Sequence, residues 1–266
     1  MTAGGSVRRG PDPCGKPLIW STAELRALDD IAVAASEVVY AFVAVAGQPS
    51  ASDEALLDDS ERARAERFVR LEDHDRFVLA HAALRLLLAR CLGVEPATVR
   101  YAQRAHGKPG LGADLARLEF NMSHSGRLGL LAVARDRPVG VDVEAVRGMA
   151  DALSIADTQF SALEREALRA LAPSERRPAF FRCWTRKEAV IKADGEGLGR
   201  PLSSFDVDLA PGSTAALTSF DGRPAELAGW SLRDLAAPPG YVAAGAAAVD
   251  PGGAPARWRQ LRAAGR

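Results

Sequence analysis

The sequence is poor in cysteine and has no net charge, and each shortage excludes a class of protein. Its three cysteines, Cys14, Cys91 and Cys183, are odd in number and far apart. No C-x-x-C pair is present, so neither a disulfide framework nor a zinc site built from thiolates is expected. Reduced thiols of this kind are typical of the cytoplasm. The 34 Lys and Arg residues balance 34 Asp and Glu residues, which argues against a dedicated nucleic-acid-binding protein.

Long apolar runs are also missing from the 266 residues. The two most apolar stretches, residues 31–46 and 79–94, are interrupted by charged side chains. Neither contains the uninterrupted run of about 18–20 apolar residues that a membrane-spanning helix needs. The N-terminus lacks the hydrophobic core of a signal peptide, so we expect a cytoplasmic protein. Residues 1–30 begin with a stretch rich in Gly, Pro and Arg, and we expect them to form a loose tail.

The rest of the chain has an ordinary globular composition and a pattern that occurs twice. With 47% hydrophobic and 26% charged residues, it can fold without disulfide or metal. A strand at 38–46 is followed by helical patterns at 53–68 and 73–92 and by strand patterns at 99–104, 118–123 and 128–134. The same order returns at 139–143, 161–171, 175–193, 205–209, 230–235 and 241–248. The sequence predicts an α+β fold of two similar β-α-α-β-β-β halves, residues 31–136 and 137–266.

Two acidic motifs are candidates for metal-assisted chemistry. In the strand that begins at residue 139, alternation places Asp142 and Glu144 on one face, and Mg²⁺ prefers carboxylate oxygens. On the long helix that follows, Glu188 and Lys192 are one turn apart and share a face. Glu188 could be a third metal ligand, and Lys192 could neutralise charge that develops on a phosphoryl group. Taken alone, each motif is more simply explained by ordinary solvent-facing charges.

Two loops add groups that suit a phosphate. Gly107 and Pro109 bend the chain around Lys108, which such a loop can expose to an anion. In the segment FNMSHSG, a strand ends with Ser123 and His124, which can hold phosphate oxygens. The alternative for the first loop is an ordinary turn with a solvated lysine. The alternative for the second is a hairpin turn whose histidine has its hydrogen bonds satisfied. A Ser–His nucleophile pair is a weaker one, since neighbouring strand residues face opposite ways and no G-x-S-x-G elbow is present.

Taken together, these motifs resemble those of one family. GKPGL, FNMSHSG, VGVDVE, FSALE and FFRCWTRKEAVIKADGEGL occur in the order typical of the Sfp-type 4′-phosphopantetheinyl transferases. The resemblance covers residues 62–249. It implies two α+β halves related by a pseudo-twofold axis, with coenzyme A in the cleft between them. It also implies that a serine hydroxyl of an apo carrier protein attacks the coenzyme A phosphate that bears pantetheine, giving holo carrier protein and 3′,5′-ADP.

The resemblance further implies catalytic roles. Asp142, Glu144 and Glu188 would hold Mg²⁺ against the pyrophosphate, and Lys192 would stabilise or protonate the leaving oxygen. Glu188, or water on the metal, would accept the serine proton. The family's other proposed base lies in the FSALE segment as Glu164, although its spacing after the serine is also that of a helix capping box.

For coenzyme A, the resemblance implies contacts from the first half of the chain. The phosphates would contact Lys108, Ser123 and His124, beside a nucleotide loop shaped by Gly107 and Pro109. Arg64 and Arg76, near the first helices, would hold the 3′-phosphate. Phe77 stands where the family sometimes has a small hydroxyl residue, so we expect an apolar contact to the adenine there.

Two other classes of function fit part of the sequence. Mg²⁺-dependent nucleases also combine carboxylates with a lysine, but their Glu and Lys lie two residues apart on a strand, unlike Glu188 and Lys192. A degenerate relative that binds coenzyme A or carrier proteins without turnover would not need all of these groups. We therefore expect an active, monomeric enzyme that serves polyketide, nonribosomal-peptide or fatty-acid synthesis, without nucleic-acid or membrane partners. Because carrier proteins are acidic, we expect them to dock at basic and apolar residues of the segment 169–182 near the cleft.

Overall fold

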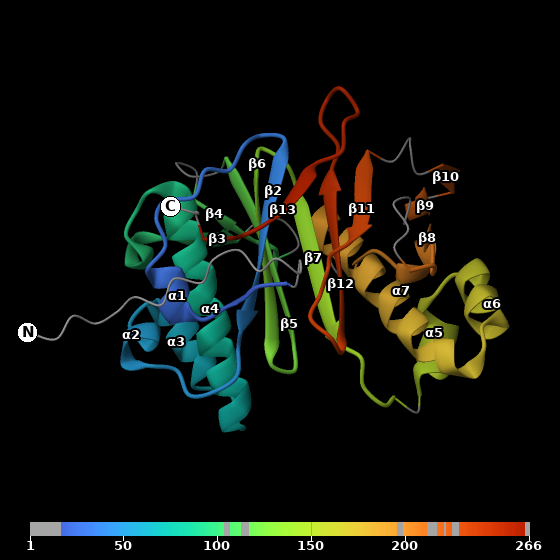
Figure 1. Cartoon of the computed structure of the whole chain (residues 1–266), viewed down its shortest axis with the longest axis horizontal. Coiled ribbons are helices and arrows are strands. Elements are labelled where there is room, and N and C mark those ends of the chain that lie inside the picture. Colours follow the sequence, from blue (N-terminus) through green and yellow to red (C-terminus); the bar gives the residue numbers. More distant parts are fainter. Residues whose placement is uncertain are drawn as a thin grey trace, which may run out of the picture.

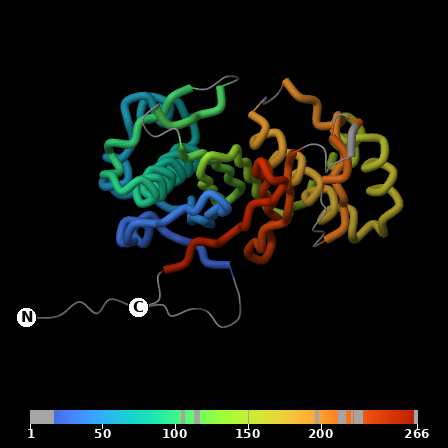
Figure 2. The backbone as a smooth tube through the Cα atoms, turned by 90° about the horizontal axis from the view of Figure 1, so that it is seen from above, coloured from blue at the N-terminus to red at the C-terminus, as the bar shows by residue number. Residues whose placement is uncertain are grey.

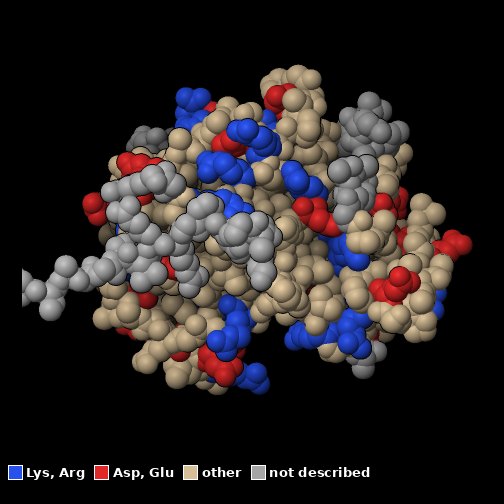
Figure 3. Space-filling view, in the orientation of Figure 1, with Lys and Arg blue, Asp and Glu red and all other residues tan. Residues whose placement is uncertain are grey.

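The computed structural model describes residues 17–103, 107–112, 117–149, 151–195, 199–211, 217–220, 222–224 and 229–263 of the chain. The long strands of two sheets occupy the middle of the molecule in Figure 1, with helices on both outer sides. The predicted mixture of helices and sheets is thus confirmed. Figure 3 shows basic and acidic side chains interspersed over one face of the molecule. No helix in the described ranges is long and apolar enough to cross a membrane.

The first half is a sheet covered on one face by the helix α4 (Leu71–Leu92). Its main strands, β2 (Glu37–Ala44), β6 (Leu128–Arg135) and β5 (Leu118–Ser125), are antiparallel neighbours in that order. Val39, Ala41 and Val43 of β2 belong to one apolar core with α4, as the two-residue period of a strand requires. Gly93 ends α4 in a left-handed conformation (φ 67°), which confirms the stop expected from the sequence.

The second half has the same strand order built from different residues. β7 (Val139–Ala145), β12 (Tyr241–Ala248) and β11 (Trp230–Asp234) are antiparallel neighbours in that order. The helix α7 (Pro173–Asp194) packs on this sheet. In both halves the long helix has 22 residues and follows the first main strand of its sheet.

The two sheets share a third apolar core, formed by the faces that the long helices do not cover. The valines at 139, 141 and 143 of β7 belong to this core together with Phe42 and Leu130 of the first sheet. Alternation along β7 turns Gly140, Asp142 and Glu144 the other way, toward α7. The predicted acidic face of this strand therefore lies between the strand and the long helix that carries Glu188 and Lys192.

Shorter elements complete the two halves. The first contains β1 (Ile19–Trp20), α1 (Thr22–Arg26), α2 (Ala51–Glu54), α3 (Asp59–Ala65), the 3₁₀ turn η1 (Pro96–Thr98), β3 (Tyr101–Gln103) and β4 (Pro109–Leu111). The second contains α5 (Ala152–Gln159), α6 (Ala162–Ala170), the 3₁₀ turn η5 (Leu202–Ser204), β8 (Phe205–Val207), β9 (Leu217–Phe220), β10 (Arg223–Pro224) and β13 (Arg257–Gln260).

The structure differs from the sequence prediction in several places. The helix expected over residues 53–68 is broken into α2 and α3, because Asp58 starts a new helix with its own capping box. The expected loose tail, residues 1–30, contains the ordered elements β1 and α1, whereas residues 1–16 lie outside the described ranges. The helix α5 and the strands β4, β9, β10 and β13 have no counterpart in the predicted pattern.

The strand β13 joins the end of the chain to the first sheet. It pairs in parallel with residues 37–40 of β2. The strand β1 pairs in parallel with residues 42 and 43 of the same strand. Figure 2 shows the red strand β13 running alongside the blue N-terminal part of the chain. Trp258 of β13 also covers Gly245 of β12, where an added Cβ would lie 2.3 Å from the indole ring. The second predicted domain, residues 137–266, therefore contributes a strand to the first sheet.

Candidate active site

A cavity of about 420 Å³ lies between the two halves and brings several predicted site residues together. Gly107, Lys108 and Pro109 line it from the first half, and Glu188 and Lys192 line it from α7. A second cavity, of about 510 Å³, lies beside α1, α2 and β2, and none of the predicted site residues lines it. Five of the predicted site residues therefore line the cavity between the halves, whereas the lining does not include Asp142, Glu144, Ser123, His124, Arg64, Arg76 or Glu164.

The acidic strand and the long helix are joined by Asp142. Its Oδ1 atom accepts hydrogen bonds from Nζ of Lys192 (2.6 Å) and from the Ser123 hydroxyl (2.6 Å). Nζ of Lys192 also lies 3.2 Å from Oγ of Ser123. Asp142 is only 3% exposed, so burial strengthens the attraction between its charge and the ammonium group. This arrangement brings β5, β7 and α7 together at one point.

Glu144 and Glu188 are the other two predicted carboxylates, and the charge of Asp142 acts on both of them. The Glu144 carboxylate accepts a hydrogen bond of 2.6 Å from the Ser125 hydroxyl. Burial raises the pKa of Glu144, and the nearby charge of Asp142 raises it further. The pKa of Glu188 is also raised, by burial and by the charges of Asp142 and Glu144, although Lys192 opposes this rise. The site therefore concentrates negative charge that a cation would stabilise.

The donor set can be tested against a divalent cation. Among the described residues, no three His, Cys, Asp or Glu side chains lie in an arrangement that could hold a metal ion as they stand. Oδ2 of Asp142, however, is buried and has no hydrogen-bond partner there. A buried carboxylate oxygen without a donor calls for a positive partner, and hard cations such as Mg²⁺ bind oxygen ligands. The residues present therefore fit such an ion.

Lys108 ties the predicted nucleotide loop to the second half. Its Nζ donates to the carbonyl oxygens of Val139 (3.2 Å) and Ala193 (3.2 Å), one on β7 and the other on α7. Gly107 adopts a left-handed conformation (φ 80°), which favours glycine and bends the loop as the sequence predicts. The lysine thus places a positive charge in the cavity at the point where the halves meet.

His124 and Arg76 lie at the end of β5. Nε of Arg76 donates to the carbonyl oxygen of Gly126 (3.0 Å), and its Nη1 pairs with Asp73 (2.6 Å). Burial lowers the pKa of His124, and the charges of Arg76 and Lys192 lower it further. The neutral imidazole is therefore favoured at neutral pH, when no anion is bound.

Arg64 lies on α3, over an aromatic side chain of α4. Its guanidinium carbon is 5.4 Å from the centre of the Phe77 ring. Phe77 is 5% exposed, and its ring stacks on His81 with centroids 3.9 Å apart. These neighbours leave little of the ring free, so the structure does not support the expected contact of Phe77 with an adenine.

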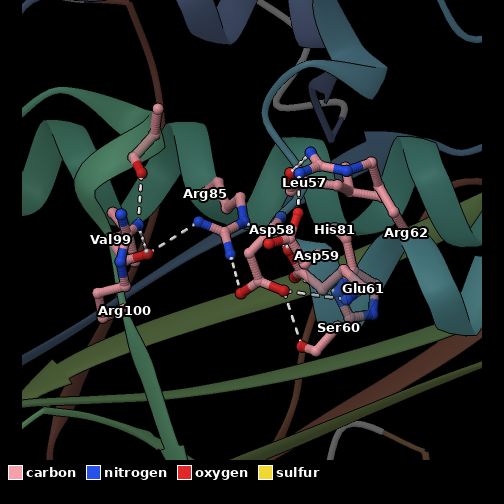
Figure 4. A network of polar contacts seen from close by, with 11 residues as sticks. Leu57, Asp58, Asp59, Ser60, Glu61, Arg62, His81, Arg85, Val99 and Arg100 are labelled. Atoms are coloured by element: carbon pink, nitrogen blue, oxygen red, sulfur yellow. Dashed lines mark hydrogen bonds and ion pairs between the residues drawn. The ribbon is translucent and has the colours of Figure 1, made fainter.

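A buried polar network holds α3, and with it Arg64, against α4 (Figure 4). The fully buried Arg85 donates to Glu61 (2.7 Å) and to Asp58 (2.6 Å). Glu61 also accepts a hydrogen bond from His81 (2.7 Å) when the ring carries a proton on Nδ1. Because Arg76 is also on α4, this network fixes the relative positions of the two arginines expected to hold the 3′-phosphate.

Glu164 lies outside the cavity, which argues against its predicted role as a base. The side chain is 2% exposed, and its Oε1 contacts Nζ of Lys187 (2.7 Å) and the backbone N–H of Val207 (2.8 Å). Its Oε2 accepts the backbone N–H of Ser161 (2.9 Å), which confirms the capping box expected from the sequence. With both oxygens engaged inside the protein, Glu164 connects α6, α7 and β8 instead of facing a substrate.

Gly140 allows β7 to approach α7 closely. A Cβ at this position would lie 2.2 Å from the carbonyl oxygen of Ala189 and 2.3 Å from the backbone nitrogen of Ala193. We therefore expect Gly140→Ala to lower the free energy of unfolding by about 1–3 kcal/mol, because the helix backbone must move. Chemical denaturation would measure this loss. Gly112→Ala is the control, since an added Cβ there meets no atom within 4 Å, and equal stability of the two variants would contradict the packing argument.

The sequence prediction assigned no role to Asn121 or Ser125, which also belong to the site. Oδ1 of Asn121 accepts the backbone N–H of Val141 (2.9 Å), and Asn121 lines the cavity. Together with Ser123, these residues occur at every second position of β5, so they share the face that meets β7. This alternation of small polar residues is visible in FNMSHSG and could have indicated a polar contact surface.

Comparisons with known proteins identify the family of this chain. Residues 138–244 match the model of the 4′-phosphopantetheinyl transferase superfamily, and residues 49–136 match that of the N-terminal part of a 4′-phosphopantetheinyl transferase. The 4′-phosphopantetheinyl transferase HetI of Nostoc is 40% identical over 196 residues, which cover 73% of this chain and 79% of that protein.

Two further relatives come from other bacteria. The 4′-phosphopantetheinyl transferase Sfp of Bacillus subtilis is 32% identical over 154 residues, covering 58% of this chain and 67% of that protein. The 4′-phosphopantetheinyl transferase AcpT of Salmonella typhimurium is 36% identical over 137 residues, covering 52% of this chain and 69% of that protein. The family expected from the motifs is confirmed, and this chain belongs to the 4′-phosphopantetheinyl transferases of the Sfp and HetI type.

Proposed function

We propose that the enzyme transfers 4′-phosphopantetheine from coenzyme A to a serine of apo carrier proteins in the cavity between its halves, with Mg²⁺ as the metal. One observation carries the assignment of the site: a single cavity joins the Lys108 loop to Glu188 and Lys192 of α7. Phosphoryl transfer requires positive groups around the transferred phosphate and an acceptor for the nucleophile's proton. This cavity offers both.

In the proposed reaction, each group acts at a named atom. The serine oxygen forms a bond to the phosphorus that bears pantetheine, and the bridging bond from that phosphorus to 3′,5′-ADP breaks. An oxygen of Glu188 accepts the serine proton, and Nζ of Lys192 stabilises charge on the leaving oxygen. Asp142, Glu144 and Glu188 are the residues that would hold Mg²⁺. When bound, the ion would neutralise charge on the phosphoryl oxygens.

We further propose that coenzyme A lies across the first half. Lys108 and His124 would contact the pyrophosphate, Gly107 and Pro109 would shape the loop, and Arg64 and Arg76 would hold the 3′-phosphate. The hydroxyl of Ser123 already donates to Asp142, so we assign it to holding this carboxylate beside the phosphates. The polar network of α3 and α4 supports this arrangement, because it keeps both arginines on one rigid unit.

The wider assignments are also proposals. We propose that the halves, residues 31–136 and 137–266, are related by a pseudo-twofold axis, since their main strands share one order. A monomer would suffice because one chain supplies both walls of the cavity. We propose a cytoplasmic enzyme of polyketide, nonribosomal-peptide or fatty-acid synthesis, without nucleic-acid partners. Carrier proteins would dock near residues 169–182, where Arg177 is exposed while Arg176 donates to backbone carbonyls of Leu171 and Arg169.

Intact-protein mass spectrometry of apo carrier proteins tests this function. After incubation with the enzyme, coenzyme A and Mg²⁺, we expect at least one carrier to gain the mass of one phosphopantetheine. EDTA should abolish the gain, and excess Mg²⁺ should restore it. If no carrier gains mass while a competent transferase modifies the same panel, the assigned acceptor is wrong. Full turnover in EDTA would reject only the proposed metal.

A further inference from the structure

Ser125 lies at the last position of β5, next to the turn that leads into β6. Its hydroxyl donates to Oε2 of Glu144 (2.6 Å) and accepts the backbone N–H of Ala145 (3.1 Å). A hydroxyl group has one proton to donate, and here that proton is committed to the carboxylate. Both contacts reach β7, so Ser125 connects the first sheet to the acidic strand of the second.

The turn after Ser125 is held from both halves of the protein. Gly126 has a left-handed conformation (φ 58°), and its carbonyl oxygen accepts a hydrogen bond of 3.0 Å from Arg76 of α4. The backbone N–H of Arg127 donates to the Tyr241 hydroxyl (3.3 Å). Tyr241 lies on β12 opposite Ala145, the residue after Glu144. The backbone that carries Ser125 is thereby fixed relative to β7.

Glu144 needs a hydrogen-bond donor such as Ser125 because the carboxylate of Asp142 lies close to it. Asp142 and Glu144 are two residues apart on the same face of β7, so their like charges repel. The side chain of a glutamate has several rotamers, and repulsion favours those that point away from Asp142. The hydrogen bond from Ser125 opposes this by holding Oε2 in one place.

We propose that Ser125 is a positioning residue that fixes the Glu144 carboxylate in the reaction centre, and that Tyr241 holds the turn that carries Ser125. The inference rests on the proposed function, in which Glu144 is one of the residues that hold Mg²⁺. Ser125 itself touches no reacting atom in this scheme. Its hydroxyl acts only through Glu144, as donors to ligating carboxylates do in other metal sites.

Calorimetric titration of Mg²⁺ into the complex of the enzyme with coenzyme A tests the proposal. Without a carrier protein there is no turnover, so the readout is affinity alone. We expect Ser125→Ala to raise Kd for Mg²⁺ about 10–100-fold. Ser125→Thr keeps a hydroxyl group and should restore most of the affinity. Tyr241→Phe should have a smaller effect, because it loosens the turn and leaves Ser125 in place.

Ser231→Ala is the matched control, since the Ser231 hydroxyl donates to the backbone carbonyl of Ala247 and neither residue lines the cavity. Unchanged Kd in Ser125→Ala, with the parent binding Mg²⁺, would overturn the proposal. If the parent itself binds no Mg²⁺, the metal assignment fails, and a double-mutant cycle on kcat with Glu144→Gln decides about Ser125. If the two losses of kcat are not additive, the positioning role is supported. If they are additive, it is overturned.

Discussion

Substitution of Glu188 by alanine should lower kcat about 100-fold or more while leaving the protein folded. Glu188 lines the cavity, and in the proposed reaction it both holds the metal and accepts the serine proton. Its neighbours Asp142 and Glu144 repel it, so loss of this carboxylate removes an unfavourable charge and costs little stability. Steady-state kinetics with a carrier protein, together with thermal unfolding, would measure both effects.

Gln159→Ala is the matched control for Glu188→Ala. Gln159 lines the same cavity but carries no charge, so its loss changes the shape of the wall without removing a carboxylate. We expect its kcat to stay within a few-fold of the parent. A folded Glu188→Ala variant with nearly parental turnover would remove Glu188 from the catalytic machinery.

The second large effect is expected at Glu164, and it concerns stability. Lys187 is fully buried, and its ammonium group pairs with Glu164 (2.7 Å) besides donating to the carbonyl oxygens of Leu202 and Phe205. Glu164→Gln keeps the size of the side chain but leaves the buried lysine charge uncompensated. Removal of one partner of a buried ion pair typically costs about 3–5 kcal/mol. Urea denaturation should show a loss of this size.

The turnover of the folded variant then separates structure from catalysis. We expect Glu164→Gln, measured at a temperature where it is still folded, to keep a kcat close to that of the parent. Glu166→Gln on the same helix is the control, because Glu166 is exposed and its loss should change neither stability nor kcat. A Glu164→Gln variant of parental stability but low kcat would reinstate Glu164 as a catalytic base.

Local patterns in the sequence were enough to predict the geometry of the acidic strand and of the long helix in the candidate site. The alternation of β7 placed Asp142 and Glu144 on one face, and the helical spacing placed Lys192 one turn from Glu188. The capping box before α6 was equally visible. Each of these predictions depends on residues no more than four apart, which is the range over which strand and helix periods act.

What the sequence did not show are pairings between distant residues. The contact that gives Glu164 its role joins it to Lys187, on a different helix and with no local pattern between them. The hydrogen bond from Ser125 to Glu144 crosses between two sheets, and the pairing of β13 with β2 joins opposite ends of the chain. Such contacts depend on how complete elements pack, which a pattern of single residues does not specify.

The coverage of β2 by β13 has a consequence for the order of events during synthesis. Translation releases β2, β5 and β6 early, so the first sheet can assemble while the rest of the chain is still in the ribosome. Residues 37–40 of β2, however, have no neighbour on their outer edge until residues 257–260 emerge. Until then, the nascent chain exposes an unpaired strand edge, the kind of surface that templates aggregation. The strand β13 closes this edge, so protection of the first sheet depends on residues that lie 220 positions further along the chain.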